Sequence, residues 1–97
     1  MIRHSVIFKF KSQISSEEKQ VFFKACDKLT AISGVQNFEI LRQISPKNRF
    51  EYGILMEFEN MDHYDYYTNH PDHLYFVENH WLKSVEDFLE IDYKPML

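Results

Sequence analysis

Apolar and polar residues alternate along four stretches of the chain. In residues 2–11 the even positions are mostly apolar and the odd positions are mostly polar. A period of two residues is typical of a β-strand that buries one of its faces. Similar alternations in residues 38–44, 50–58 and 85–93 predict three further strands.

The first helix is predicted between the first two strands. Ser15 and Glu18 have the spacing of a capping box, and apolar residues follow at helical intervals. We therefore expect a helix from about Ser16 to about Ile32. It should stop at Gly34, because glycine is favoured at the C-terminal end of helices.

Two shorter helices are predicted between the third and fourth strands. Asn60 can cap a helix that Pro71 forces to end near residues 69–70. Another short helix should run from Asp72 to about Lys83. Its inner side is expected to carry three apolar residues: Leu74, Val77 and Trp81.

The order of these elements is strand, helix, strand, strand, helix, strand. Turn residues 45–48 should join the middle strands as a hairpin. The pattern predicts an α+β fold of the ferredoxin-like βαββαβ type, with helices on one face of a four-stranded antiparallel sheet. The other face should also present apolar residues, namely Ile7, Leu41, Leu55 and Phe88. A second copy of the sheet is the economical cover, so we expect a homodimer, a dimeric α/β barrel.

Composition narrows the class of protein. With 97 residues the chain forms one domain, residues 1–97, and its net charge of -4 without a basic run argues against nucleic-acid binding. His4 and Lys9 interrupt the apolar residues of the N-terminal stretch 1–10, so it lacks the continuous apolar core expected of a signal peptide, and no apolar run is long enough to span a bilayer. A single cysteine, Cys26, forms no intrachain disulfide. We expect a cytoplasmic protein.

The candidate catalytic residues lie in residues 66–76, the stretch YYTNHPDHLYF. His73 should lie in the first turn of a helix, whose dipole favours the neutral ring, and Tyr67 lies shortly before the Pro71 break. A neutral base beside a phenol can abstract a proton alpha to a carbonyl without any cofactor. Alternatively, His73 bonds a backbone carbonyl and Tyr67 packs in the core. His70 precedes proline and is interpreted as structural.

The remaining candidates are pocket walls or core residues. They share the inner faces of the predicted strands and helices: His4, Val6, Phe8, Phe22, Phe23, Met56, Phe76 and Trp81. His70 and His73, together with Asp72, Glu78 or His80, offer zinc-ligand atoms, but the proline between the two histidines opposes their convergence, and no metal site is predicted. His63 and His80 are expected to face solvent.

Three segments resemble the stress-responsive dimeric α/β-barrel (Dabb) family: residues 4–11 (HSVIFKFK), residues 53–59 (GILMEFE) and residues 70–73 (HPDH). The resemblance covers nearly the whole chain. It implies a dimeric barrel with a hydrophobic pocket in each subunit. In a plant member, olivetolic acid cyclase, the positions of His73 and Tyr67 are the catalytic pair.

The same resemblance concerns four candidate pocket residues, of which His4 is already named above. His4 and His70 match histidines of the family. Tyr52 stands where a further histidine is often found, and Cys26 replaces a helix aromatic of the cyclase.

Three functions follow as alternatives. The first is binding of a small hydrophobic or phenolic molecule, and the second is a cofactor-free cyclase or lyase acting on a polyketide-like substrate. The third is a stress-associated structural protein without catalysis. Dimeric ferredoxin-like monooxygenases share the architecture, so a cofactor-free oxygenase is a further alternative, against which the H-P-x-H element of residues 70–73 argues. The sequence leaves the ligand and the presence of catalysis open.

Overall fold

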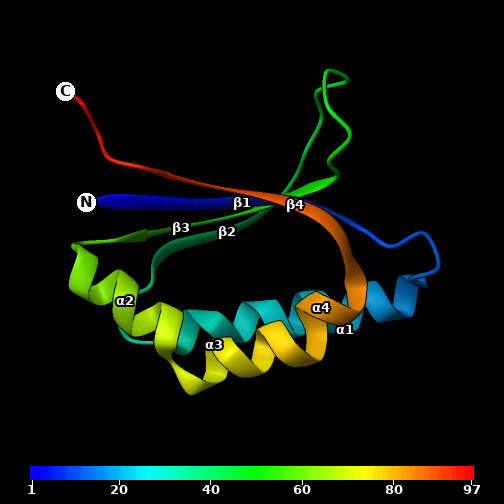
Figure 1. Cartoon of the computed structure of the whole chain (residues 1–97), viewed down its shortest axis with the longest axis horizontal. Coiled ribbons are helices and arrows are strands. Elements are labelled where there is room, and N and C mark those ends of the chain that lie inside the picture. Colours follow the sequence, from blue (N-terminus) through cyan, green and yellow to red (C-terminus); the bar gives the residue numbers. More distant parts are fainter.

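The sheet consists of four antiparallel strands in the spatial order β2-β3-β1-β4 (Figure 1). The structure is a computed structural model that describes residues 1–97. Its strands span Ile2–Phe10 (β1), Gln36–Arg42 (β2), Tyr52–Phe58 (β3) and Val85–Tyr93 (β4). This topology confirms the predicted ferredoxin-like α+β fold.

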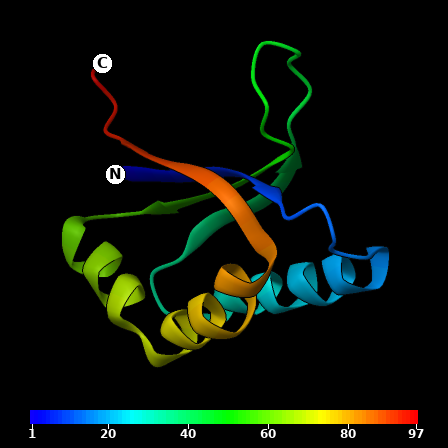
Figure 2. The same cartoon turned by 45° about the vertical axis from the view of Figure 1, so that its right-hand side comes forward.

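The helices all lie on one side of the sheet, and the other side is open (Figures 1 and 2). They are α1 (Ser16–Asp27), α2 (Met61–Asn69), α3 (Pro71–Phe76) and α4 (Leu82–Ser84), with a 3-10 turn η1 (Lys28–Ala31) after α1 and a π turn η2 (Val77–Trp81) before α4. None of these helices has the length and apolar character needed to cross a membrane.

The helix starts are capped as the sequence predicts. The Ser15 hydroxyl accepts from the Glu18 amide, and the Glu18 carboxylate accepts from the Ser15 amide, each at 3.1 Å. The Asn60 side chain accepts from the His63 amide at 3.0 Å and so starts α2. Gly34 has a φ of +96° after η1, a conformation that favours glycine.

The connection between β2 and β3 is longer than predicted. The strand expected to reach Ile44 ends at Arg42, and Ile44 is 88% exposed. Residues 43–51 form a loop that projects beyond the sheet, away from the helices (Figure 2). The Gln43 side chain closes this loop by donating to the Phe50 carbonyl at 2.7 Å. The Gln43 amide also donates to the Glu51 carbonyl at 2.9 Å, so the base of the loop is held by one further backbone bond and by side-chain hydrogen bonds.

A β-bulge at Glu86 changes which residues of the last strand face the helices, so the faces predicted for this strand were wrong. Lys9 pairs with Asp87 and Phe10 with Val85, which leaves one extra residue in β4. Phe88, expected on the open face, therefore lies opposite buried Phe8 on the helix side. The alternation after the bulge places Leu89 and Ile91 on the open face instead.

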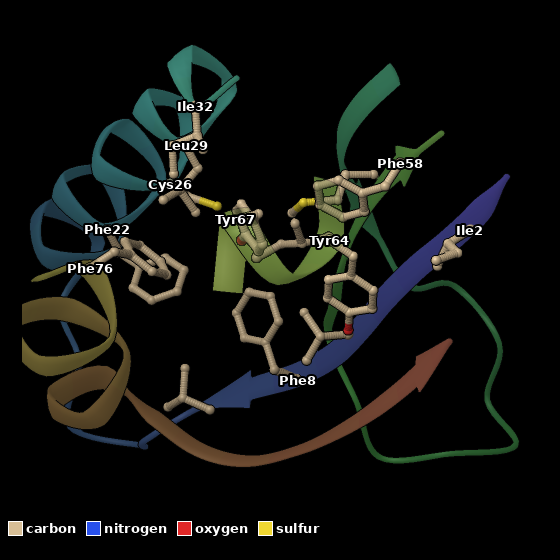
Figure 3. Close-up of a cluster of buried hydrophobic side chains, with 14 of the residues drawn as sticks. Ile2, Phe8, Phe22, Cys26, Leu29, Ile32, Phe58, Tyr64, Tyr67 and Phe76 are labelled. Carbon is tan, nitrogen blue, oxygen red and sulfur yellow. The ribbon is translucent and has the colours of Figure 1, made fainter. Parts of the chain in front are cut away.

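The core fills the space between the sheet and the helices (Figure 3). Its fully buried members include Phe8, Phe22, Phe58, Met56 and Cys26.

The third helical segment differs in one respect from the prediction. Leu74, expected on the inner side, is 49% exposed, and Phe76 takes the inward position. The π turn has more residues per turn than an α-helix, so it brings Trp81 back beneath the sheet beside Phe76.

Candidate functional site

A cavity of about 270 Å³ lies between the helix side of the sheet and the segment from α3 to α4. Most of its wall is apolar. The lining residues come from every layer of the fold: His4, Val6, Leu29, Ile54, Met56, Tyr67, His73, Phe76, Val77, Trp81, Leu82, Phe88 and Glu90. An apolar cavity with a few polar groups is the usual form of a small-molecule site.

Tyr67 reaches this cavity from α2. Its side chain is buried beside Cys26 of α1 (Figure 3), and the residue is only 3% exposed. Its hydroxyl makes no hydrogen bond within the chain, yet no buried polar side-chain atom lacks a partner. The hydroxyl must therefore open onto the cavity. Burial raises the pKa of Tyr67, so the phenol stays protonated at neutral pH.

His73 lies beside Tyr67, with the two ring centroids 4.5 Å apart. In the neutral ring, Nδ1 donates to the Thr68 carbonyl at 3.0 Å and Nε2 is left as an acceptor. Burial lowers the pKa of His73, and the nearby His4 lowers it further. Burial, and not the helix dipole predicted from the sequence, is thus the chief cause of the lowered pKa of His73.

His4 belongs to a network that sequence reasoning missed. Its Nδ1 bonds the Asp92 carboxylate at 2.6 Å, and the Tyr64 hydroxyl donates to the other oxygen of Asp92 at 2.8 Å. His4 is 6% exposed, and Nε2 has no partner within the chain. Because no buried polar atom is unsatisfied, Nε2 also opens onto the cavity. The Asp92 bond fixes the orientation of the ring.

Glu90 places a carboxylate at the edge of the same cavity. One oxygen of Glu90, one of Asp92 and one ring nitrogen of His4 all lie within 4.8 Å of one another. Such a group has the atoms of a metal site, but His4 and Asp92 already satisfy each other. The histidines considered from sequence do not form a comparable group with Asp72, Glu78 or His80.

The structure brings seven of the predicted site residues together at the cavity: His4, Val6, Met56, Tyr67, His73, Phe76 and Trp81. The other six lie elsewhere: Phe8, Phe22, Phe23, Cys26, Tyr52 and His70.

Those six have identifiable structural surroundings. Phe8 and Phe22 fill the core, and Tyr52 packs between Phe23 and Arg42. Burial raises the pKa of the Cys26 thiol to about 12, which keeps it unreactive. His70 caps α3, because its Nδ1 accepts from the Asp72 amide at 3.0 Å.

Six lining residues were missed: Leu29, Ile54, Val77, Leu82, Phe88 and Glu90. Phe88 and Glu90 reach the cavity only because the bulge at Glu86 turns them to the helix side. An irregularity of this kind leaves no mark in the alternation of apolar residues. His80, expected in solvent, is half-buried and stacks on Phe76 at 5.8 Å between centroids. His63 is exposed, as predicted.

Comparison with known protein families and solved structures identifies close relatives of this chain. The model of the stress responsive A/B barrel domain family matches residues 2–95. A Dabb-family protein with a ferredoxin-like fold from Mesorhizobium loti is 48% identical, with a TM-score of 0.93, over 98% of this chain and 96% of that chain. In a comparison with curated protein sequences, no significant match is found.

Two more distant structures share the fold. A dimeric protein of unknown function from Bacteroides fragilis is 23% identical, with a TM-score of 0.74, over 96% of this chain and 94% of that chain. Hydroxynitrile lyase from Passiflora edulis is 18% identical, with a TM-score of 0.84, over 95% of this chain and 90% of that chain. At these identities the likeness concerns the fold.

Proposed function

The chain belongs to the stress responsive A/B barrel domain (Dabb) family, and from this premise we propose that it binds a small hydrophobic or phenolic molecule in the cavity beside Tyr67 and His73. One observation carries the proposal. Buried Tyr67 and half-buried His73, on different helices, each direct a polar atom without a protein partner into one apolar cavity. A core without a ligand role satisfies such atoms internally.

The chemistry of these atoms fits a phenol or another neutral molecule with a hydroxyl group. His73 Nε2 accepts the ligand hydroxyl, and the Tyr67 hydroxyl donates to the ligand oxygen. Trp81 and Phe88, with ring centroids 5.4 Å apart, supply aromatic wall for the apolar part. A cavity of about 150 Å³ accommodates a benzene ring, so the present one holds a single ring with a short side chain.

Titration calorimetry with p-cresol and 4-ethylphenol tests the proposal. Wild-type protein should bind, and His73→Ala and Tyr67→Phe should each weaken binding about tenfold, the size of one lost hydrogen bond in a buried site. His63→Ala is the matched control, because His63 is an exposed histidine of α2 outside the cavity. Unchanged affinity in both cavity variants would contradict the proposed site.

A second candidate is a cofactor-free cyclase or lyase reaction at the same pair. It is favoured by the neutral Nε2 of His73 beside a protonated Tyr67, the arrangement of a base and an acid. As a lyase, His73 would take the hydroxyl proton of a cyanohydrin while the carbon–cyanide bond breaks and the cyanide ion leaves. Release of cyanide from mandelonitrile by wild-type protein, and its loss in His73→Ala, would support catalysis over binding alone.

Self-association is part of the proposal. Leu41 and Leu89 are exposed on the open face, and Ile7, Leu55 and Ile91 are half-buried there. A sheet that is apolar on its uncovered face requires a cover. The dimeric relative of the same fold supports a second copy in this role. We place the homodimer in the cytoplasm, where a lone thiol such as Cys26 stays reduced.

A further inference from the structure

Glu90 is the one acidic side chain in the wall of the cavity, and no lysine or arginine lines it. The carboxylate forms no ion pair within the chain. The neighbouring strand β1 carries two basic residues, and both are already paired: Arg3 with Glu57 and Lys9 with Glu86. The cavity therefore carries an uncompensated negative charge.

The polar atoms that open onto the cavity are mostly acceptors. When their rings are neutral, His4 and His73 each present an acceptor Nε2, because their Nδ1 atoms are bonded to Asp92 and to the Thr68 carbonyl. Glu90 adds carboxylate oxygens. Two groups can donate: the Tyr67 hydroxyl and the indole N–H of Trp81, which lines the cavity. A ligand that satisfies this set must itself bring several donors.

The aromatic wall favours positive charge as well. Phe76, Trp81 and Phe88 line the cavity with Tyr67, and the faces of such rings attract organic cations. Carboxylate, imidazole acceptors and aromatic faces, without a basic side chain, together match an ammonium group. A carboxylate ligand would meet Glu90 and Asp92 with no cation to balance it.

We propose that the cavity selects a small apolar molecule carrying a protonated primary amine, whose ammonium group lies between Glu90 and His4. The apolar part lies against Trp81, Phe76 and Phe88. This inference rests on the proposed function, because it specifies the ligand class of the same cavity. Glu90 is a specificity-determining residue here, and Tyr67 and His73 remain the contacts for neutral ligands.

Three ligands of nearly equal size test the charge preference: 2-phenylethylamine, 2-phenylethanol and phenylacetate. Their affinities are measured by titration calorimetry at neutral pH for wild-type protein, Glu90→Gln and Glu86→Gln. Glu86 is the matched control, because it lies on the same strand, pairs with Lys9 and does not line the cavity. All variants keep the shape of the original side chain.

Wild-type protein should bind the amine about fivefold more tightly than the alcohol, as one partly exposed ion pair contributes. Phenylacetate should bind most weakly. Glu90→Gln should remove the preference for the amine and leave the alcohol unchanged, and Glu86→Gln should behave as wild type.

Two results would overturn the inference alone: equal affinity for amine and alcohol in wild-type protein, or an amine preference that survives Glu90→Gln. In both cases the alcohol still binds, and the proposed function stands. If none of the three ligands binds but p-cresol does, the inference alone fails; if p-cresol does not bind either, the proposed function fails together with the inference. Binding of Zn²⁺ or Mg²⁺ that is lost in both Glu90→Gln and Asp92→Asn would also overturn it, in favour of a metal.

Discussion

The rings of Tyr67 and His73 lie with their centroids 4.5 Å apart, although the two residues belong to different helices. The contact depends on the break at Pro71. The amide of His70 bonds the Tyr67 carbonyl and closes α2, and the His70 side chain then starts α3. The chain thus changes direction between α2 and α3, and both rings line the cavity. A base and a phenol meet there without any intervening residue.

His73 should make stability depend on pH. Burial lowers its pKa from 6.5 in the folded state. Between the folded value and 6.5, the unfolded chain binds a proton that the folded chain does not, so stability rises with pH in this window. The contribution is fully present above pH 6.5 and is lost as the pH falls through the folded pKa.

Urea unfolding of wild-type protein and His73→Gln between pH 4 and pH 8 measures this effect. The wild-type free energy of unfolding should fall more steeply than that of the variant as the pH drops below about 6.5. Equal slopes in the two proteins would show that His73 titrates alike in the folded and unfolded states.

Tyr64 should stabilise the fold through its hydroxyl. The group donates to Asp92 at 2.8 Å and lies 2.9 Å from His4 Nδ1. Tyr64→Phe keeps the ring stacked on Phe58 but removes this bond, at a cost of about 1 kcal/mol in the free energy of unfolding. Tyr66→Phe, at an exposed tyrosine of the same helix, should cost almost nothing in the same urea titration. If the two variants lowered the free energy of unfolding equally, the hydrogen bonds of the Tyr64 hydroxyl would not stabilise the fold.

His70 should act as a cap and not as a ligand. His70→Ala removes the acceptor for the Asp72 amide and should lower the free energy of unfolding by about 1 kcal/mol. His70→Asn restores a capping oxygen and should regain most of that loss. Both variants should bind p-cresol as wild type does. If the asparagine variant were as unstable as the alanine variant, the imidazole would have another role.

The open face of the sheet should hold the dimer together. Leu89→Arg places a charge among the apolar residues of this face and should weaken dimerisation at least about tenfold, because the buried arginine would lack a partner. Val21→Arg, at an exposed apolar position of α1, is the control. Sedimentation velocity at micromolar concentration measures the dimerisation of the wild-type protein and of both variants. A wild-type monomer, or a dimer that Leu89→Arg leaves intact, would contradict the homodimer.

The strands and helices were predictable because each is encoded by local patterns. The alternation in residues 2–11 and the capping residues Ser15 and Asn60 predicted β1 and the starts of α1 and α2 correctly. The α-helix expected to reach about Ile32, in contrast, ends at Asp27 and continues as the 3-10 turn η1. The site was predictable in part. His73 and Tyr67 stood out by residue type and by their position around Pro71, but Cys26 and Tyr52 suggested pocket walls and proved to pack elsewhere.

The sequence alone determined the order of strands and helices, the face of β1 that is buried and the break that separates Tyr67 from His73. Those features follow from residue periodicity, capping and the geometry of proline. Only the tertiary structure decided that a bulge at Glu86 turns Glu90 toward the cavity and that Asp92 orients His4. These relationships join residues from opposite ends of the chain, and they depend on strand register and side-chain packing, which no local pattern records.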